Sequence, residues 1–218
     1  MGKKPFLTSV MRVIDPLCVQ HAASLLGIDS CDVALKCSPA FCAGRLAAWE
    51  ALQNYGLAGD ATVIGRFPSG APKWPEGFCG SISHNRHVAW AVVSGYPECI
   101  SVGIDVEEAS RFVSKFHLWK RIACVQEQVR LQDLPFIEAE VLCLLFSAKE
   151  AIYKCIFPVV GHFFGFHEAC YVGRDTSNIL CFHLSNRLKV SGAPVSIRVH
   201  FRFVQGHFFC IALHTSEF

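Results

Sequence analysis

The sequence predicts an α+β fold made of two similar halves. Its strongest patterns follow one another as helix, hairpin, helix and hairpin, the order that two consecutive α+β units would give. At 218 residues, the chain is long enough to bury a sizeable core, as one large domain or two small ones. We expect halves of residues 1–109 and 110–218, joined near Ala109, although they share no residue-level repeat.

Composition excludes several broad classes of protein. With 52% hydrophobic and 17% charged residues, the chain is too apolar to be mainly disordered. No apolar run approaches the length of a membrane-spanning helix, and the amino terminus lacks the apolar segment of a secretory signal. The formal net charge of +2 gives no strong case for nucleic acid. We therefore expect a cytoplasmic protein without stable membrane insertion.

The 12 cysteines are scattered along the chain and include no Cys-x-x-Cys pair. Secreted disulfide scaffolds concentrate their cysteines in short loops, so we interpret these as reduced thiols that mostly fill the core. A zinc site built from cysteines and the 10 histidines stays open, but no spacing supports it.

The first helix is predicted over Ala43–Tyr55. Apolar residues recur there at near-helical spacing, and Gly56 can cap the end. Arg45 is expected in the first turn, where a cation opposes the helix dipole. This placement mildly favours a binding role for Arg45 over the alternative of a solvated surface arginine.

A loop is predicted over residues 66–80, which are rich in Gly and Pro. Long irregular segments in compact domains are often functional, and Lys73 is flanked by prolines that would hold it in place. After this loop, Ser83 and His84 could donate hydrogen bonds to a phosphate; alternatively, His84 is a satisfied structural group. Residues 88–94 form a buried strand, and a Gly-Tyr-Pro-Glu turn leads to the next strand. We expect a hairpin that brings the loop near that next strand.

The next strand and a later helix carry the acids on which the functional prediction rests. In residues 102–108, alternation places Asp105 and Glu107 on one face of a strand. Residues 146–154 read as helix, where Glu150 and Lys154 share a face, and Pro158 is expected to stop that helix. If strand and helix meet, three carboxylates converge, and oxygen ligands of this kind favour Mg²⁺. Taken separately, each stretch is better explained by the plainer alternative, a solvated face of an ordinary strand for Asp105 and Glu107 and a surface ion pair for Glu150 and Lys154.

Residues 111–121 carry four cations and no acid, interleaved with large apolar side chains. Such a segment could dock an acidic partner, or it could be an amphipathic helix with its apolar side in the core. The last hairpin is predicted from alternation in residues 196–203 and 208–214 around a Gln-Gly turn.

Three motifs, in this order and at these separations, resemble the 4′-phosphopantetheinyl transferases of the longer, single-chain class. They are Gly-Ser-Ile-Ser-His at 80–84, Gly-Ile-Asp-Val-Glu at 103–107 and Phe-Ser-Ala-Lys-Glu-Ala-Ile-Tyr-Lys at 146–154. Residues 44–52 and 72–77 look like the bacterial branch of the family that includes the enterobactin synthetase transferase component. The resemblance spans roughly residues 44–154.

The resemblance implies two pseudo-symmetric α+β halves with the active site between them. It implies transfer of phosphopantetheine from coenzyme A to a serine of an acyl or peptidyl carrier protein. Matched residue by residue, Asp105, Glu107 and Glu150 would hold Mg²⁺. Glu150 would also be the catalytic base, and Lys154 would neutralise the departing phosphate. The positions that match the coenzyme's phosphate contacts are Arg45, Lys73, Ser83, His84 and Lys154.

The basic residues that hold the 3′-phosphate in family members have no clear match, with only Lys36 upstream and Arg86 as a substitute. The basic segment 111–121 would meet the acidic carrier. We expect a monomer, because one chain carries both halves of the site. The alternative function is a non-catalytic coenzyme A-binding or regulatory protein on the same scaffold.

Overall fold

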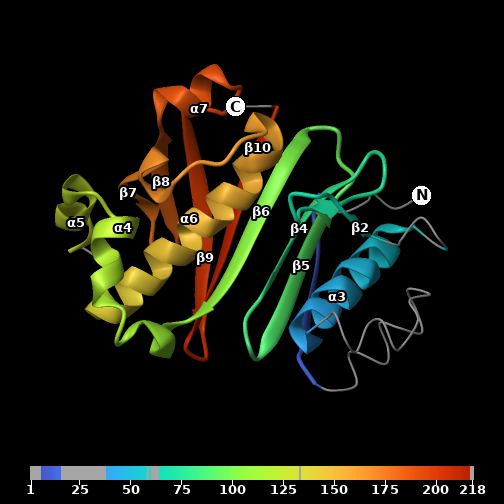
Figure 1. The fold of residues 1–218 in the computed structure, drawn as a ribbon, viewed down its shortest axis with the longest axis horizontal. Helices are drawn as coiled ribbons and strands as arrows, with labels where there is room; N and C mark the ends of the chain where they lie inside the picture. Colours follow the sequence, from blue (N-terminus) through green and yellow to red (C-terminus); the bar gives the residue numbers. More distant parts are fainter. Residues whose placement is uncertain (1–5, 16–37, 58, 60–63, 133, 217–218) are drawn as a thin grey trace. The chain divides into compact units, whose positions relative to one another are not determined.

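The computed structural model describes residues 6–15, 38–57, 59, 64–132 and 134–216. They belong to two compact units, the first extending to Ile100 and the second spanning Ser101–Ser216 (Figure 1). Each unit contains helices and a sheet, which confirms the predicted α+β class. The units divide earlier than the expected boundary after residue 109, because most of the acid-bearing strand belongs to the second unit and pairs there.

The first unit packs one long helix, α3 (Pro39–Tyr55), on a three-stranded antiparallel sheet. The sheet has the order β1, β5, β4, with strands at Thr8–Val13, Val88–Ser94 and Cys79–His84. The Ser38 hydroxyl accepts a hydrogen bond from the Phe41 amide at the start of α3, and Gly56 ends the helix with φ 105°. The predicted helix and its glycine cap are therefore confirmed, with a start four residues earlier than expected.

The segment predicted as loop contains a short two-stranded ribbon. Strand β2 (Gly65–Arg66) pairs antiparallel with β3 (Pro72–Lys73), so that Gly65 lies opposite Lys73. Pro72 can take this position because a two-stranded ribbon leaves one side of each strand without a ladder. The rest of residues 66–80 outside β2, β3 and the start of β4 is irregular, as predicted.

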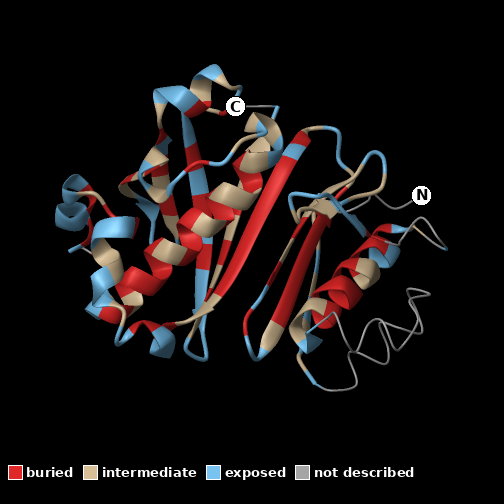
Figure 2. Ribbon diagram, viewed as in Figure 1, coloured by how far each residue is buried: buried red, intermediate tan, exposed pale blue. Residues whose placement is uncertain are grey.

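The second unit packs helix α6 (Glu138–Val160) against a five-stranded sheet, chiefly against β10 and β9. The sheet has the order β6, β10, β9, β8, β7, with strands at Cys99–Glu108, His207–Thr215, Ser196–Val204, Ile179–Leu184 and Ala169–Thr176. Figure 2 shows that β6 is buried along most of its length, as is the inner side of α6. Burial of these apolar faces provides most of the stability that such elements contribute.

Helix α6 runs past the residue predicted to stop it. Pro158 lies in its last turn, and the helix ends at Val160, followed by the capping residue Gly161, whose φ is 70°. A proline near a helix end removes one backbone donor without breaking the turns before it, so the prediction that Pro158 stops the helix is wrong. The consequence is one uninterrupted helix that carries the whole motif 146–154 on its buried middle turns.

The basic segment 111–121 is not one amphipathic helix. It forms three short pieces, η2 (Ala109–Phe112), η3 (Phe116–Leu118) and α4 (Trp119–Ile122), followed by α5 (Val125–Leu131). Phe112 and Ile122 are buried, whereas Lys120 and Arg121 are exposed. Two further short helices complete the unit, η4 (Phe166–Glu168) and α7 (Asn186–Val190).

One predicted hairpin forms and the other does not. Strands β9 and β10 pair through a two-residue turn at Gln205 and Gly206, both with positive φ, which matches the type I′ turn favoured in hairpins. The predicted hairpin between residues 88–94 and the acid-bearing strand is wrong, since β5 pairs with β1 and β4 while β6 pairs with β10. Within the described residues, no helix combines the length and apolar character needed to cross a bilayer.

Candidate active site

The acids of the strand motif lie near the end of β6, where the strand approaches α6 closely. A Cβ added to Gly103 would lie 1.9 Å from the Ala151 carbonyl oxygen, so only glycine allows the two backbones to come this near. Two residues further on, Asp105 is buried with 5% of its surface exposed, and Glu107 follows it on the same face of the strand. This close packing explains why a strand and a helix distant in sequence can share one polar site.

Lys154 of α6 reaches directly to the strand. Its Nζ donates hydrogen bonds to Asp105 Oδ1 at 2.8 Å and to the Ile104 carbonyl at 3.0 Å. Glu150 lies one turn earlier on α6, on the same helix face. The helix and the strand therefore meet, which was the condition set by the sequence analysis. Their contact is a charge-assisted, partly buried hydrogen bond.

The pKa values of the neighbouring acids respond to this crowding. Burial raises the pKa of Glu107 to about 7, and the Asp105 charge adds to the rise, while Arg111 and other cations oppose it. Arg111 Nη1 lies 3.5 Å from Glu107 Oε2. Burial also raises the pKa of Glu150, with a further rise from Asp105 and an opposing effect of Lys154. Like charges held in a poorly solvated place favour protonation, or a bound cation.

Asp105, Glu107 and Glu150 have the donor atoms that suit a magnesium ion, although they are not arranged as a closely spaced group of ligands. Their hard oxygens are the ligands that Mg²⁺ takes, and their raised pKa values mean that a divalent cation would relieve real repulsion. Among the described residues, the group of three potential ligands that lie within 4.8 Å of one another is elsewhere, at Cys124, Glu127 and Cys170. Asp105, Glu107 and Glu150 do not form such a group; Asp105 is held by Lys154 instead.

The group at Glu127 is explained by hydrogen bonding rather than by a metal. Glu127 is fully buried, and both of its oxygens receive the Lys149 ammonium, at 2.7 and 2.9 Å. The Tyr171 amide donates to Oε1 and the Cys124 amide to Oε2. Both oxygens thus have two donors each, which leaves no lone pair for a cation. Lys149, the residue before Glu150 in the motif, is therefore structural.

Arg45 of the first unit is buried, which excludes the solvated alternative. Its Nη1 donates to the carbonyls of Ile64 and Gly65, both at 3.1 Å, and its guanidinium lies over the Phe41 ring. Because α3 begins at Pro39, Arg45 lies in the second turn, so the prediction of a first-turn cation opposing the dipole is wrong. In this structure Arg45 fixes the backbone that enters β2.

The remaining predicted phosphate contacts are spread over two elements of the first unit. Lys73 is exposed on β3. Ser83 is buried and His84 is exposed at the end of β4, and as neighbours in a strand they face opposite sides of the sheet. The His84 ring lies beside Gly44 of α3, where a Cβ would come within 3.7 Å of it. Arg86 Nε donates to its neighbour His87 at 2.8 Å, and Lys36 lies outside the described residues.

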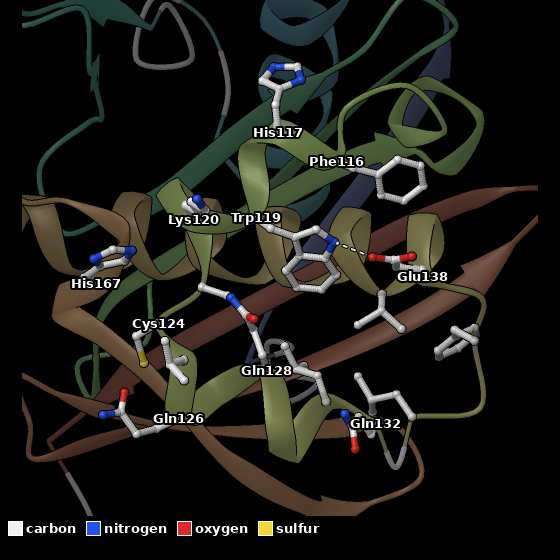
Figure 3. A pocket seen from close by; sticks show the side chains of 16 residues that line it. Phe116, His117, Trp119, Lys120, Cys124, Gln126, Gln128, Gln132, Glu138 and His167 are labelled. Atoms are coloured by element: carbon white, nitrogen blue, oxygen red, sulfur yellow. Dashed lines mark hydrogen bonds between the residues drawn. The ribbon is translucent and has the colours of Figure 1, made fainter.

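The described part of the second unit has a hollow lined by Glu150 and a second, larger one. The smaller cavity, of about 600 Å³, is also lined by Arg121, Tyr153 and a run of aromatic residues, Phe163, Phe164 and Phe166. The larger hollow, of about 1210 Å³, is lined by residues of 116–141 and by His167 (Figure 3). None of Asp105, Glu107, Glu150 and Lys154 lines it. In it, Trp119 Nε1 donates to Glu138 Oε1 at 3.1 Å.

The sequence prediction missed three features of the site: Arg111 beside Glu107, the close approach at Gly103, and the cavity at Glu150. Arg111 was recognised only as part of a basic segment, because a spacing of four residues predicts a contact within a helix and Glu107 lies on a strand. Gly103 stood within a motif and could have been interpreted as a position of close backbone approach. The aromatic run at 163–166 gave no sequence signal that it lines a cavity.

Two family models match the chain. The 4′-phosphopantetheinyl transferase N-terminal domain matches residues 34–94, and the 4′-phosphopantetheinyl transferase superfamily matches residues 101–198. Together these matches cover most of the chain, one in each compact unit.

Curated relatives agree with the family models. Enterobactin synthase component D of Escherichia coli K12 is 39% identical over 112 residues, 51% of this chain and 51% of its own length. The 4′-phosphopantetheinyl transferase Svp of Streptomyces mobaraensis is 32% identical over 131 residues, 59% of this chain and 52% of its own. The chain thus spans about half the length of the curated relatives it matches.

A solved structure has a weaker likeness. Helicobacter pylori holo-[acyl-carrier-protein] synthase, in complex with coenzyme A, aligns over 52% of this chain and 99% of its own at a TM-score of 0.42 and 18% identity. A likeness of that size carries no argument about this chain.

Proposed function

We propose a function from the premise that this chain belongs to the 4′-phosphopantetheinyl transferase superfamily: it transfers 4′-phosphopantetheine from coenzyme A to a serine of an apo carrier protein. The products are the holo-carrier and adenosine 3′,5′-bisphosphate. The observation that carries the proposal is the contact between Lys154 and Asp105, which joins the helix motif to the strand motif at 2.8 Å.

Glu150 is proposed as the base that takes the serine proton. Its pKa is raised by burial and by the Asp105 charge, which brings a carboxylate closer to the operating pH and makes it a better proton acceptor. Glu150 also lines a cavity, so a serine hydroxyl can approach it from solvent. The serine oxygen would then attack the phosphorus that bears the pantetheine.

Lys154 is proposed to stabilise the charge that develops on the departing adenosine phosphate. Its ammonium already sits among acidic groups and is 29% exposed, so a phosphate can reach it without unfolding the helix. Asp105, Glu107 and Glu150 are proposed to hold Mg²⁺, which when bound would neutralise the pyrophosphate oxygens. Their oxygen donors and raised pKa values support this assignment.

Contacts to the coenzyme's phosphates are proposed for Arg45, Lys73, Ser83 and His84, because these positions match the family motifs. Lys73 and His84 are exposed and can meet a ligand directly. Arg45 already binds two carbonyls, so its contribution is the smaller one and includes holding the backbone at Gly65, opposite Lys73.

The test is intact-protein mass spectrometry of apo carrier proteins incubated with this protein, coenzyme A and Mg²⁺. We expect the mass of one phosphopantetheine to be gained per carrier, and the gain to be lost in EDTA. The carrier set includes peptidyl carriers of siderophore assembly, which the name enterobactin synthase component D favours, and a fatty-acid carrier. Tight coenzyme binding with no transfer to any carrier would contradict the proposal and indicate a binding protein.

A pair of matched variants separates chemistry from folding. Glu150→Ala should abolish detectable transfer while the thermal midpoint of unfolding stays close to that of the wild type. Glu138→Gln changes an exposed acid on the same helix, retains an acceptor for Trp119, and should transfer at the wild-type rate. Transfer by Glu150→Ala at the wild-type rate would remove Glu150 from the mechanism.

We also propose that the protein acts as a cytoplasmic monomer. One chain carries residues matching both sets of motifs, so a second copy is not needed to complete them. Light scattering after size exclusion, at concentrations that bracket those of the transfer assay, should give the mass of one chain. A dimer that alone has activity would contradict this.

A further inference from the structure

Two thiols meet where β4 and β6 begin. Cys79 is the first residue of β4 and Cys99 the first residue of β6, and their Sγ atoms are 3.5 Å apart. The Cys79 thiol donates to Cys99 Sγ and also lies 3.5 Å from the Cys99 carbonyl oxygen. Both residues belong to the first unit, and Cys79 is only half-buried. The two sulfur atoms are therefore already close enough to react with each other once one of them is oxidised.

The second unit contains a comparable pair, which differs in its electrostatics. Cys124 Sγ and Cys170 Sγ are 4.0 Å apart, next to the buried Glu127. Burial raises the pKa of Cys170 to about 11, and the Glu127 charge adds to the rise. At Cys99, by contrast, the hydrogen bond from Cys79 lowers the thiol pKa more than burial raises it, with a smaller lowering by Ser94. The thiolate is the reactive form, so the two pairs should differ in their rate of oxidation.

We propose that Cys79 and Cys99 are a redox modification site, which a peroxide converts to a reversible disulfide. This inference goes beyond phosphopantetheine transfer and does not rest on it. The two residues are already neighbours at the end of the β4–β5 ladder, where Cys79 pairs with Ser94, and their sulfur atoms are in contact.

The chemistry balances with hydrogen peroxide as the oxidant. The Cys99 thiolate attacks one peroxide oxygen, the O–O bond breaks, and the hydroxide that leaves takes up the thiol proton to become water. Cys99 is then a sulfenic acid. The Cys79 sulfur attacks the Cys99 sulfur, the S–O bond breaks, and the second hydroxide leaves as water with the Cys79 proton. The two sulfurs together lose two electrons, which reduce the peroxide.

The disulfide would close a covalent ring around the β4–β5 hairpin and the turn that follows it. In that turn the Cys99 amide donates to the Tyr96 carbonyl at 2.9 Å, and the Ser94 hydroxyl accepts from the Tyr96 amide at 3.2 Å. The new bond would hold the start of β6 against the start of β4. Closing a ring of this kind restricts the unfolded chain and so raises the thermal midpoint.

The experiment treats the full, reduced protein with a low excess of hydrogen peroxide and follows intact mass and peptide maps over time. We expect a loss of 2 Da in the first step, reversed by dithiothreitol, with Cys79 and Cys99 in one linked peptide. The oxidised form should have a higher thermal midpoint and slower amide exchange in residues 95–99. Oxidation at Cys124 and Cys170 should be at least tenfold slower.

Matched variants complete the test. Cys124→Ser should oxidise at the wild-type rate, whereas Cys79→Ser should gain 16 Da at Cys99 without the 2 Da loss, because the second sulfur is missing. If Cys79→Ser does not fold, Cys79→Ala is used. A first disulfide that joins any other pair of cysteines, or the absence of a Cys79–Cys99 link after full oxidation, would overturn the proposal.

Discussion

Lys154 has a structural contact with the neighbouring strand and, separately, a proposed role in the reaction. It pairs with Asp105 in this structure, and in the proposed reaction it meets the departing phosphate. We predict that Lys154→Ala lowers the turnover number for transfer by about 10² to 10³, the usual effect of removing one electrostatic stabiliser of a transition state. Steady-state kinetics against a saturating carrier measures this.

The control for that prediction is Lys189→Ala, which removes a half-buried lysine from α7 whose Nζ donates to Asn186 Oδ1. Its turnover should match the wild type. If both variants lose activity equally, the loss in Lys154→Ala results from removing a positive charge anywhere on the protein, and not from the position of Lys154.

Glu107 gives the site a pH dependence. Its pKa lies near 7 when folded and near its ordinary value of 4.5 when unfolded, so between these values the folded state binds the additional proton. Without metal, its contribution to stability therefore falls as pH rises from about 4.5 to about 7 and is level above that. Glu107→Gln removes the cost of burying an ionised carboxylate. This variant should therefore unfold at a higher temperature than the wild type at pH 8 in EDTA.

The same proton competes with a cation. Because Mg²⁺ needs the ionised carboxylate, the concentration of Mg²⁺ that gives half-maximal transfer should rise as pH falls below 7. Titrating Mg²⁺ at pH 6 and at pH 8 tests this, and equal midpoints at the two pH values would argue that Glu107 is not a ligand.

At the scale of elements, the contact of β6 with α6 depends on one missing side chain. A Cβ at position 103 would lie 1.9 Å from the Ala151 carbonyl oxygen and 2.4 Å from the Cys155 amide nitrogen, both backbone atoms. We predict that Gly103→Ala lowers the free energy of unfolding by about 3 kcal/mol or more. Neither the β6 backbone nor the α6 backbone can move away without losing its own hydrogen bonds. Denaturant unfolding followed by circular dichroism measures the change.

Gly165→Ala is the matched control for Gly103→Ala. Gly165 has a negative φ of −93°, and a Cβ there would meet nothing within 4 Å. Its effect should stay within about 1 kcal/mol. Similar losses in both variants would mean that glycine flexibility, and not close packing, explains position 103.

Sequence predicted the elements better than their pairing. The helix at α3, the acid-bearing strand, the helix at α6 and the hairpin of β9 with β10 follow from local periodicity and turn residues. The pairing partners of β5 and β6 could not be predicted in this way. Both strands are buried apolar runs joined by a short turn, which is typical of a hairpin, but they pair with the distant strands β1 and β10 instead. Strands β1, β7 and β8 lacked a sufficient local pattern.

For the whole molecule, a bound cation should appear as added stability. An ion that binds the folded state alone stabilises it by mass action, by about 2.7 kcal/mol at 100 times its dissociation constant. We predict that Mg²⁺ raises the thermal midpoint of the wild type, and that Asp105→Asn loses most of this increase. An equal increase in both would place the binding ion elsewhere.

The residues of the candidate site stay a prediction from the motifs, and the structure adds how some of them are arranged. The motifs gave the three acids and Lys154, and the structure pairs Lys154 with Asp105. The sequence could not show that Arg45 donates to two backbone carbonyls, or which of Ser83 and His84 is buried. Both depend on how the whole chain packs around these residues.

Lys149 and Glu150 stand side by side in one motif and serve different ends: the first is buried against Glu127, and the second lines a cavity. Selection for a folded chain therefore acts on Lys149 even where selection for turnover has ceased. A descendant that had exchanged only Glu150 would still fold and still carry most of the motif. Under the proposed mechanism, the residue at position 150 would then show whether such a chain keeps the catalytic base.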